Sequence, residues 1–313
     1  TSIALVPRSV TSRGGMSWAR SIAPAGSRSL LTKWKRRGYA SARPMLSADV
    51  AAAVACILKS KSFDNGTICA SEQAIVTETA IEQKVIAELI AQGAYMCDER
   101  ARDALQRVVM QPHGGVNPAV VGKSALEVAV MAGLDVPPGT RVLVARLNGV
   151  GKAHPLSAEK LCPVLAFYVE SDWEAACLRC IELLNYGGLG LLLAIHCKDE
   201  AVIREFALKK PVNRILVNTP SSHGAIGFST GLLPSLTLGC GSWGGNITSD
   251  NVGPLHLINR KRVAYDIGRI AATPEYVAAR AQSQEGRRAR LSGAEAEALR
   301  RLDRAAITRL VDS

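Results

Sequence analysis

The residue with the clearest capacity for chemistry in this chain is a cysteine that follows a short turn. Cys69 comes shortly after the Asp-Asn-Gly sequence at 64–66, which is typical of a tight turn, and before a β-like run at 74–77. A thiol at such a junction can face a cleft, and the turn can aim backbone N–H groups at whatever the sulfur attacks. The alternative is an ordinary buried small residue, which is the commoner role of a free cysteine.

Nucleophilic catalysis by a cysteine requires more than the sulfur atom. The thiol needs a lowered pKa or a local base, and the product oxyanion needs hydrogen-bond donors. Glu159, in the sequence Glu-Lys-Leu-Cys-Pro at 159–163, is a second candidate group. The spacing does not show which acid or base approaches the thiol, so the residues alone indicate a candidate thiol enzyme.

Other patterns give weaker support for a site. Cys177 and Cys180 form a Cys-x-x-Cys pair within a helical pattern and lack a second pair of ligands, which favours a core-facing pair over zinc or a redox dithiol. The Gly-Gly-x-Gly sequence at 187–190 precedes a strand instead of opening a helix, so it fails the context of a dinucleotide-binding fingerprint. The histidines show no metal-ligand spacing, and no metal is expected; they are His113, His154, His196, His223 and His256.

Composition limits the class of protein. With 313 residues the chain is long enough for one large domain or two smaller ones. No apolar run is long enough to span a membrane, so no membrane association is expected. Eight cysteines are scattered through helix-like and strand-like segments, which predicts reduced thiols and a cytoplasmic setting.

The net charge of +11 is concentrated at the two ends of the chain. Residues 1–44 contain nine Lys or Arg and no acidic residue, and residues 269–313 contain nine Arg against six acidic residues. The body between them is close to neutral, which does not resemble a phosphate-binding surface, so nucleic-acid binding is not expected. Residues 1–44 are predicted to form a basic, unmatched and disordered arm, with an organelle transit peptide as the alternative.

The elements that must position Cys69 follow from the spacing of apolar residues. Helices are predicted from Ser47 to about Leu58 and at 79–92, 98–110, 122–132, 171–185 and 199–209. Strands are predicted at 74–78, 141–146, 164–169, 191–196 and 213–217. Strands that alternate with helices of this length indicate an α/β fold, with a largely parallel sheet covered by helices on both faces.

Four long motifs resemble those of CoA-acylating aldehyde dehydrogenases. They are FDNGTICASEQ (63–73), EKLCPVLAFY (159–168), NRILVNTPSSHGAIG (213–227) and LLPSLTLGCGSWGGNITSDNVGPLHLINRK (232–261). The chain is most similar to the aldehyde dehydrogenase half of the bifunctional aldehyde-alcohol dehydrogenases, with the acylating sulfoacetaldehyde dehydrogenases near it. The motifs occur in order, and the resemblance implies an aldehyde dehydrogenase-like catalytic domain at 45–268.

The resemblance also implies a reaction, in which an aldehyde, coenzyme A and NAD⁺ become an acyl-CoA and NADH. Cys69 matches the catalytic nucleophile, which carries the acyl group as a thioester, with its backbone N–H as an oxyanion donor. Glu159 matches the cofactor-binding glutamate that holds the nicotinamide ribose, and Pro163 is expected to shape the same loop. A small aldehyde substrate and a homo-oligomer are implied as well.

Two departures from the family pattern bear on activity. The family's glycine turn is usually followed by His-Thr, whereas this chain has Leu191 and Leu192, which predicts the loss of a polar group near the thiol. The family's amino-terminal cofactor domain has no match in residues 1–44. A truncated catalytic portion with weak or no NAD-dependent activity alone is therefore expected, and the alternative is a non-catalytic oligomerising or shell-interacting remnant.

Residues 269–313 are predicted to form a linker and a terminal amphipathic helix, with an apolar face made of Leu299, Leu302, Ala306 and Leu310. This arrangement is similar to the encapsulation peptides that direct aldehyde dehydrogenases into bacterial microcompartments. It implies a microcompartment shell protein as a partner. Docking of the helix on its own subunit or on a neighbouring one is an equal alternative.

Overall fold

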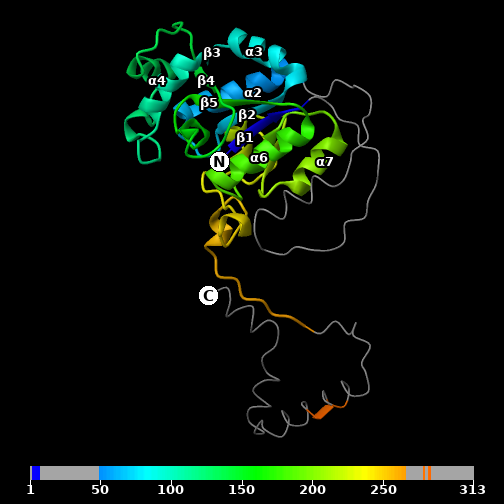
Figure 1. Ribbon diagram of the computed structural model, residues 1–313. Coiled ribbons are helices and arrows are strands. Elements are labelled where there is room, and N and C mark those ends of the chain that lie inside the picture. The colour runs from blue at the N-terminus through cyan, green and yellow to red at the C-terminus, as the bar shows by residue number, and fades with distance from the viewer. Residues whose placement is uncertain (1, 8–48, 266–277, 279–280, 283–313) are drawn as a thin grey trace. The chain divides into compact units, whose positions relative to one another are not determined.

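A computed structural model describes residues 2–7, 49–265, 278 and 281–282 of the chain (Figure 1). The chain divides into two units, Thr1–Ile258 and Asn259–Ser313. All the described strands lie in the first unit. The amphipathic helix predicted near the carboxyl end and residues 8–48 of the predicted arm lie outside the described residues, so both expectations stay predictions.

Seven parallel strands form one sheet in the order β3-β4-β5-β2-β1-β6-β7. The strands are β1 (Ser2–Val6), β2 (Glu72–Glu78), β3 (Ala94–Cys97), β4 (Val142–Arg146), β5 (Val164–Glu170), β6 (Leu193–Ile195) and β7 (Ile215–Val217). The predicted α/β class with a parallel sheet is confirmed.

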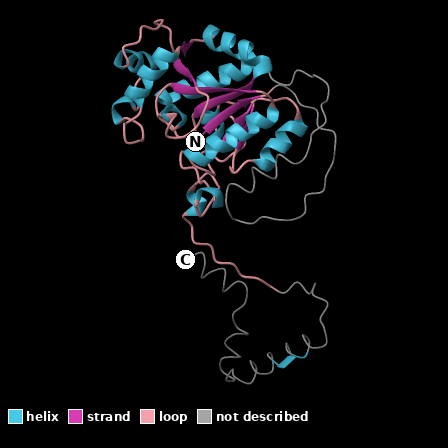
Figure 2. Ribbon diagram, viewed as in Figure 1, coloured by secondary structure: helices cyan, strands magenta, loops and turns pink. Residues whose placement is uncertain are grey.

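Helices cover both faces of this sheet (Figure 2). They are α2 (Val50–Ser62), α3 (Glu82–Ala91), α4 (Glu99–Val109), α5 (Ala125–Met131), α6 (Trp173–Gly187), α7 (Glu200–Lys209) and the short α8 (Ser221–Ala225). Five of them begin at a polar residue whose side chain accepts a hydrogen bond from the first turn, which fixes where each helix starts: Asp49, Asp98, Ser124, Asp172 and Asp199. The first of these helices therefore starts after Asp49 and not after Ser47.

Two hydrophobic cores lie on opposite sides of the sheet. Alternate residues of a strand point to opposite faces, and β1 divides accordingly between the cores. Ile3 and Leu5 pack in the core under α4, α5, α6 and α7, whereas Ala4 and Val6 pack in the core under α2 and α3. All four side chains are fully buried.

The position of β1 differs from the disorder expected for residues 1–44, but only at residues 2–6. Ser2–Val6 is the strand between β2 and β6, where Leu5 pairs with Val76 on one side and with Ile195 on the other. A short apolar run that ends at a proline is a signal of a buried strand, but the basic residues that follow dominated the composition of the segment. The four-residue strand β3 was not predicted either.

No helix in the described parts of the chain combines the length and the apolar character needed to cross a bilayer.

Candidate active site

The turn before Cys69 has an uncommon backbone conformation that its sequence makes possible. After α2 ends, Asp64, Asn65 and Gly66 all adopt positive φ angles, of 48°, 48° and 73°. Most residues avoid this left-handed region, whereas Gly enters it freely and Asn and Asp tolerate it. The Asp-Asn-Gly sequence therefore reverses the chain sharply between α2 and β2 and presents Cys69 on the connecting turn.

The turn is held from two directions. Asn65 Nδ2 donates a hydrogen bond of 2.9 Å to the carbonyl oxygen of Gly122. Within the turn, the Thr67 backbone N–H and hydroxyl both donate to the carbonyl oxygen of Asp64, at 3.1 and 2.9 Å. Gly66 rests directly against the backbone of Cys162, which belongs to the loop that carries Glu159.

Cys69 is a free thiol on an exposed residue. Partial burial of the sulfur raises its pKa, and the nearby Glu159 and Cys240 raise this pKa further, whereas the residue's own backbone N–H opposes the shift. The thiol is therefore mostly protonated at neutral pH, and a reaction through it requires the proton to be removed during attack.

The loop around Glu159 is attached to two strands. The backbone N–H of Lys160 donates to Gln73 Oε1 on β2 at 3.1 Å, and the carbonyl oxygen of the buried Pro163 accepts from the Leu143 N–H on β4 at 2.9 Å. Glu159 is half-buried in this loop and close enough to Cys69 to affect its pKa. The structure thus brings Cys69 and Glu159 together, with Pro163 on the same loop.

The two leucines that stand in place of His-Thr are buried. Leu191 and Leu192 form a small apolar cluster with Ala70, the residue after Cys69, and with Leu216 and Ala225. Cys240 packs at the edge of the same cluster. The side of the Cys69 turn that faces β6 is therefore apolar at this point.

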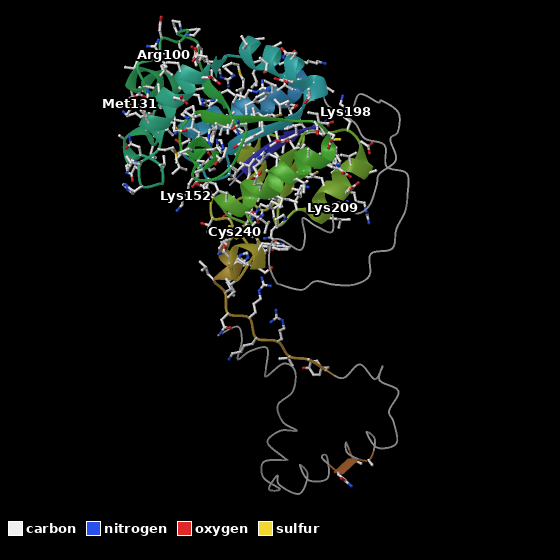
Figure 3. All side chains as sticks on the ribbon, in the orientation of Figure 1. Arg100, Met131, Lys152, Lys198, Lys209 and Cys240 are labelled. Atoms are coloured by element: carbon white, nitrogen blue, oxygen red, sulfur yellow. The ribbon has the colours of Figure 1, made fainter. Side chains whose placement is uncertain are left out.

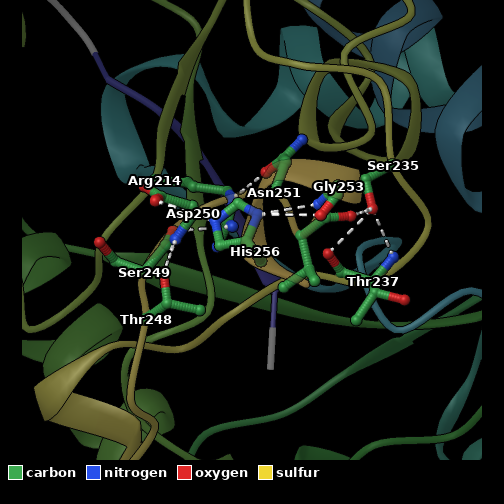
Figure 4. A network of polar contacts seen from close by, with 10 residues as sticks. Arg214, Ser235, Thr237, Thr248, Ser249, Asp250, Asn251, Gly253 and His256 are labelled. Atoms are coloured by element: carbon green, nitrogen blue, oxygen red, sulfur yellow. Dashed lines mark hydrogen bonds and ion pairs between the residues drawn. The ribbon is translucent and has the colours of Figure 1, made fainter. Parts of the chain in front are cut away.

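An arginine that the sequence did not single out holds the glycine-rich loop in place (Figure 4). Arg214 donates from Nε to Asn251 Oδ1 at 3.0 Å, from Nη1 to the Gly239 carbonyl at 2.6 Å and from Nη2 to the Ser249 carbonyl at 2.9 Å. Asn251 Nδ2 in turn donates to the carbonyl oxygens of Ala225 and Leu233, at 2.8 and 2.7 Å.

This network fixes Cys240, which is labelled in Figure 3, near the thiol of Cys69. Asn213 Nδ2 also donates to the Cys240 carbonyl oxygen at 2.5 Å. Arg214 interacts electrostatically with both Cys69 and Cys240. In the sequence, the only indication of this role for Arg214 is that a single cationic residue stands at the start of a β-like run.

The remaining cysteine pair belongs to the core. Cys177 and Cys180 on α6 are buried among apolar side chains, as predicted, and burial raises the pKa of Cys180 to about 12. Among the described residues, no group of three or more His, Cys, Asp or Glu is arranged to hold a metal ion.

Comparisons with known proteins give this geometry a family. No family-level sequence model matches the chain. It is 42% identical over 223 residues to the bifunctional aldehyde-alcohol dehydrogenase of Escherichia coli, a match that covers 70% of this chain and 25% of the relative. It is 34% identical over 220 residues to the acetylating succinate-semialdehyde dehydrogenase of Clostridium kluyveri, covering 70% of this chain and 48% of the relative.

A solved structure supports the same family as the sequence comparisons. A probable aldehyde dehydrogenase from Listeria monocytogenes superimposes with a TM-score of 0.69 at 49% sequence identity, covering 71% of this chain and 49% of that one. The parallel sheet and the cysteine turn thus define an aldehyde dehydrogenase-like catalytic domain. The chain belongs to the CoA-acylating aldehyde dehydrogenases, and it spans between a quarter and half of the length of these relatives.

Proposed function

We propose that Cys69 is the nucleophile of a CoA-acylating aldehyde dehydrogenase, which converts a small aldehyde, coenzyme A and NAD⁺ into an acyl-CoA and NADH. The observation that carries this proposal is the partly buried thiol of the exposed residue Cys69, which lies shortly after the left-handed turn at 64–66 and near Glu159. A rigid turn supports nucleophilic attack because it fixes the direction of the sulfur relative to the substrate.

The chain's own residues account for the covalent steps. The Cys69 sulfur attacks the aldehyde carbon, and the proton of the thiol is transferred to the former carbonyl oxygen to give a thiohemiacetal. Loss of hydride from this carbon and of the hydroxyl proton gives a thioester on Cys69. The thiol of coenzyme A then attacks the thioester, which releases the acyl-CoA and returns the thiol of Cys69. The backbone N–H of Cys69 is a suitable donor to the oxyanion in both attacks.

The nicotinamide cofactor fits one feature of this site. The half-buried carboxylate of Glu159 is an acceptor that suits the two ribose hydroxyls, and Pro163 holds its loop against β4. When bound, NAD⁺ supplies the acceptor for the hydride. Glu159 and Pro163 are therefore our proposed cofactor-binding residues.

The test uses the acyl-transfer step in reverse, because that step involves no nicotinamide. The purified full chain is incubated with propionyl-CoA, and the acyl adduct is measured by intact mass and located by peptide mapping. We expect transfer of the acyl group to Cys69 with release of coenzyme A, and no adduct at that peptide in Cys69→Ala. Cys56→Ala, which removes a half-buried thiol on α2, is the matched control and should acylate normally.

Absence of an adduct on Cys69 in the folded wild-type chain would overturn the proposal. It would favour the alternative of a non-catalytic oligomerising or shell-interacting protein. In a second assay, formation of NADH that depends on both aldehyde and coenzyme A measures the complete reaction.

We further propose a cytoplasmic location, since all eight cysteines are free thiols. A homo-oligomer and a microcompartment shell partner are also proposed, the latter from the apolar face predicted in residues 269–313. Fusion of residues 275–313 to a fluorescent protein tests the shell partner, because diffuse fluorescence in shell-producing cells would exclude targeting by this segment.

A further inference from the structure

Fully buried polar side chains flank the Cys69 turn on both sides. They come from the end of α2, from the last residue of the turn and the start of β2, from the Glu159 loop and from α8. All have no exposed surface: Ser60, Lys61, Ser71, Glu72, Gln73, Lys160, Ser221 and Ser222. Buried polar groups of this kind are retained where they are hydrogen-bonded to one another. Here they surround the segment that carries the proposed nucleophile.

Glu72 connects three elements of this layer. Its Oε1 accepts a hydrogen bond of 3.1 Å from the backbone N–H of Ser221 at the start of α8. Its carboxylate also accepts from the Ser60 hydroxyl on α2. Ser60 Oγ in turn accepts from the backbone N–H of Ser222 at 2.8 Å. The first residue of β2 is thereby joined to α2 and α8, three residues after Cys69.

Several charged or titratable groups face this carboxylate. From α2 come Lys61, whose Nζ donates to Gln73 Oε1 at 3.4 Å, and Cys56. In the neighbouring loop, Lys160, Cys162 and Glu159 interact with Lys61. On α8, His223 Nδ1 shares a hydrogen bond of 2.9 Å with Ser222 Oγ. Glu72 Oε2 has no hydrogen-bond partner among the described residues. The carboxylate therefore depends on the Ser221 and Ser60 donors and on the charge of Lys61.

We propose that Glu72 is a positioning residue for Cys69, whose ionised carboxylate locks the start of β2 against α2 and α8 and so fixes the Cys69 turn. This inference rests on the proposed nucleophilic role of Cys69. The ionised form accepts from both the Ser221 N–H and the Ser60 hydroxyl. The protonated form carries a hydroxyl of its own, and Ser60 Oγ already accepts from Ser222, so protonation changes the network behind the turn.

Burial raises the pKa of Glu72 to about 7, against the hydrogen bonds from Ser60 and Ser221 and the charge of Lys61, which lower it. Burial also lowers the pKa of Lys61 to about 8, whereas Cys162, Glu72 and Glu159 oppose this shift. The reactivity of Cys69 should therefore change near pH 7 as Glu72 ionises, separately from the titration of the thiol at higher pH.

The experiment measures the rate of iodoacetamide alkylation of Cys69 in the native full chain between pH 6 and 10, with each cysteine resolved by peptide mapping. We expect two inflections in the wild type, one near pH 7 and one from the thiol. Glu72→Gln keeps the size of the side chain and an acceptor oxygen but cannot titrate, so only the upper inflection should remain. An inflection near pH 7 that persists in Glu72→Gln would belong to another group, such as Lys61, and would overturn the proposal.

For a second variant we expect the lower inflection of the alkylation profile to shift instead of disappearing. Ser60→Ala removes a hydrogen bond that favours ionised Glu72, so the lower inflection should move to higher pH. A lower inflection that stays in place, or moves to lower pH, contradicts the proposed network. Glu78→Gln is the matched control, because it removes a buried carboxylate at the other end of β2 and should leave the Cys69 profile unchanged.

The same variants separate this inference from the proposed function. If wild-type Cys69 is not acylated by propionyl-CoA, the enzymatic proposal fails, but the alkylation profile still shows whether Glu72 controls the thiol. If Cys69 is acylated and the profile is unchanged in both Glu72→Gln and Ser60→Ala, the positioning role fails alone. Acyl transfer in Glu72→Ala should fall about tenfold, the effect of one lost charged hydrogen bond.

Discussion

The Cα atom of Gly66 lies so close to the backbone of Cys162 that an added Cβ would come within 2.9 Å of both the carbonyl carbon and the carbonyl oxygen of Cys162. This contact joins the turn before Cys69 to the loop that carries Glu159. The segments that carry the two candidate site residues, Cys69 and Glu159, therefore meet at this backbone contact. Their relative position depends on Gly66 having no side chain.

Gly66→Ala should destabilise the chain by roughly 3–4 kcal/mol, because it adds a steric overlap to the cost of a left-handed alanine. Gly133 is the matched control, since its φ is 66° and an added Cβ would have no atom within 4 Å. Gly133→Ala should cost only about 1–2 kcal/mol. Urea unfolding measures both changes, and equal losses would show that the Cys162 contact does not matter.

Arg214→Lys should destabilise the loop at 239–251 by about 2–4 kcal/mol. A lysine ammonium cannot reproduce the planar geometry that reaches Asn251, Gly239 and Ser249 together, and a buried cation that loses its acceptors is costly. Amide hydrogen exchange should show faster exchange within this loop. Arg102→Lys, at a surface pair with Asp103, is the control and should change stability by less than about 0.5 kcal/mol. Unchanged exchange in Arg214→Lys would contradict the role of the network.

His196 should make the chain less stable at acidic pH. It is buried at the end of β6, and burial lowers its pKa from 6.5 to about 4. The unfolded chain binds a proton at this side chain below about pH 6.5 and the folded chain does not, so the free energy of unfolding falls as the pH decreases from 6.5 to 4.

Replacement of His196 by Leu should flatten this acid-side slope, reducing the loss between pH 6.5 and 4 by roughly 2–3 kcal/mol. Unfolding in urea at a series of pH values measures the slope. The exposed His113 provides the control, because His113→Leu should leave the slope as it is. An identical slope in wild type and His196→Leu would rule out this linkage.

Much of the fold could be predicted from the spacing of apolar residues. The helix predicted at 171–185 is Trp173–Gly187, and the strand predicted at 164–169 is Val164–Glu170. These elements have long periodic patterns and clear caps. The strand Ser2–Val6 was missed because the basic residues after it dominate the composition of that segment. The strand Ala94–Cys97 was missed because its pairing depends on the distant strand β4.

The candidate site could be predicted in part. Cys69 and Glu159 came from a turn sequence and from family motifs. The buried Lys61, Glu72 and Arg214 did not, because charged residues usually lie at the surface, and only the tertiary structure shows which of them are surrounded. Their hydrogen-bond partners come from separate segments of the chain, so the local spacing of residues does not predict that these charged side chains are buried.

The central place of β1 has a consequence for how this molecule folds. Without β1, the remaining strands form two separate groups, β3-β4-β5-β2 and β6-β7. The contact that unites them joins Leu5 to Ile195, about 190 residues apart along the chain, so its loop-closure entropy is large. Residues 2–6 therefore join the two groups of strands, and the pairing of β1 with β6 is expected to be a slow step in refolding.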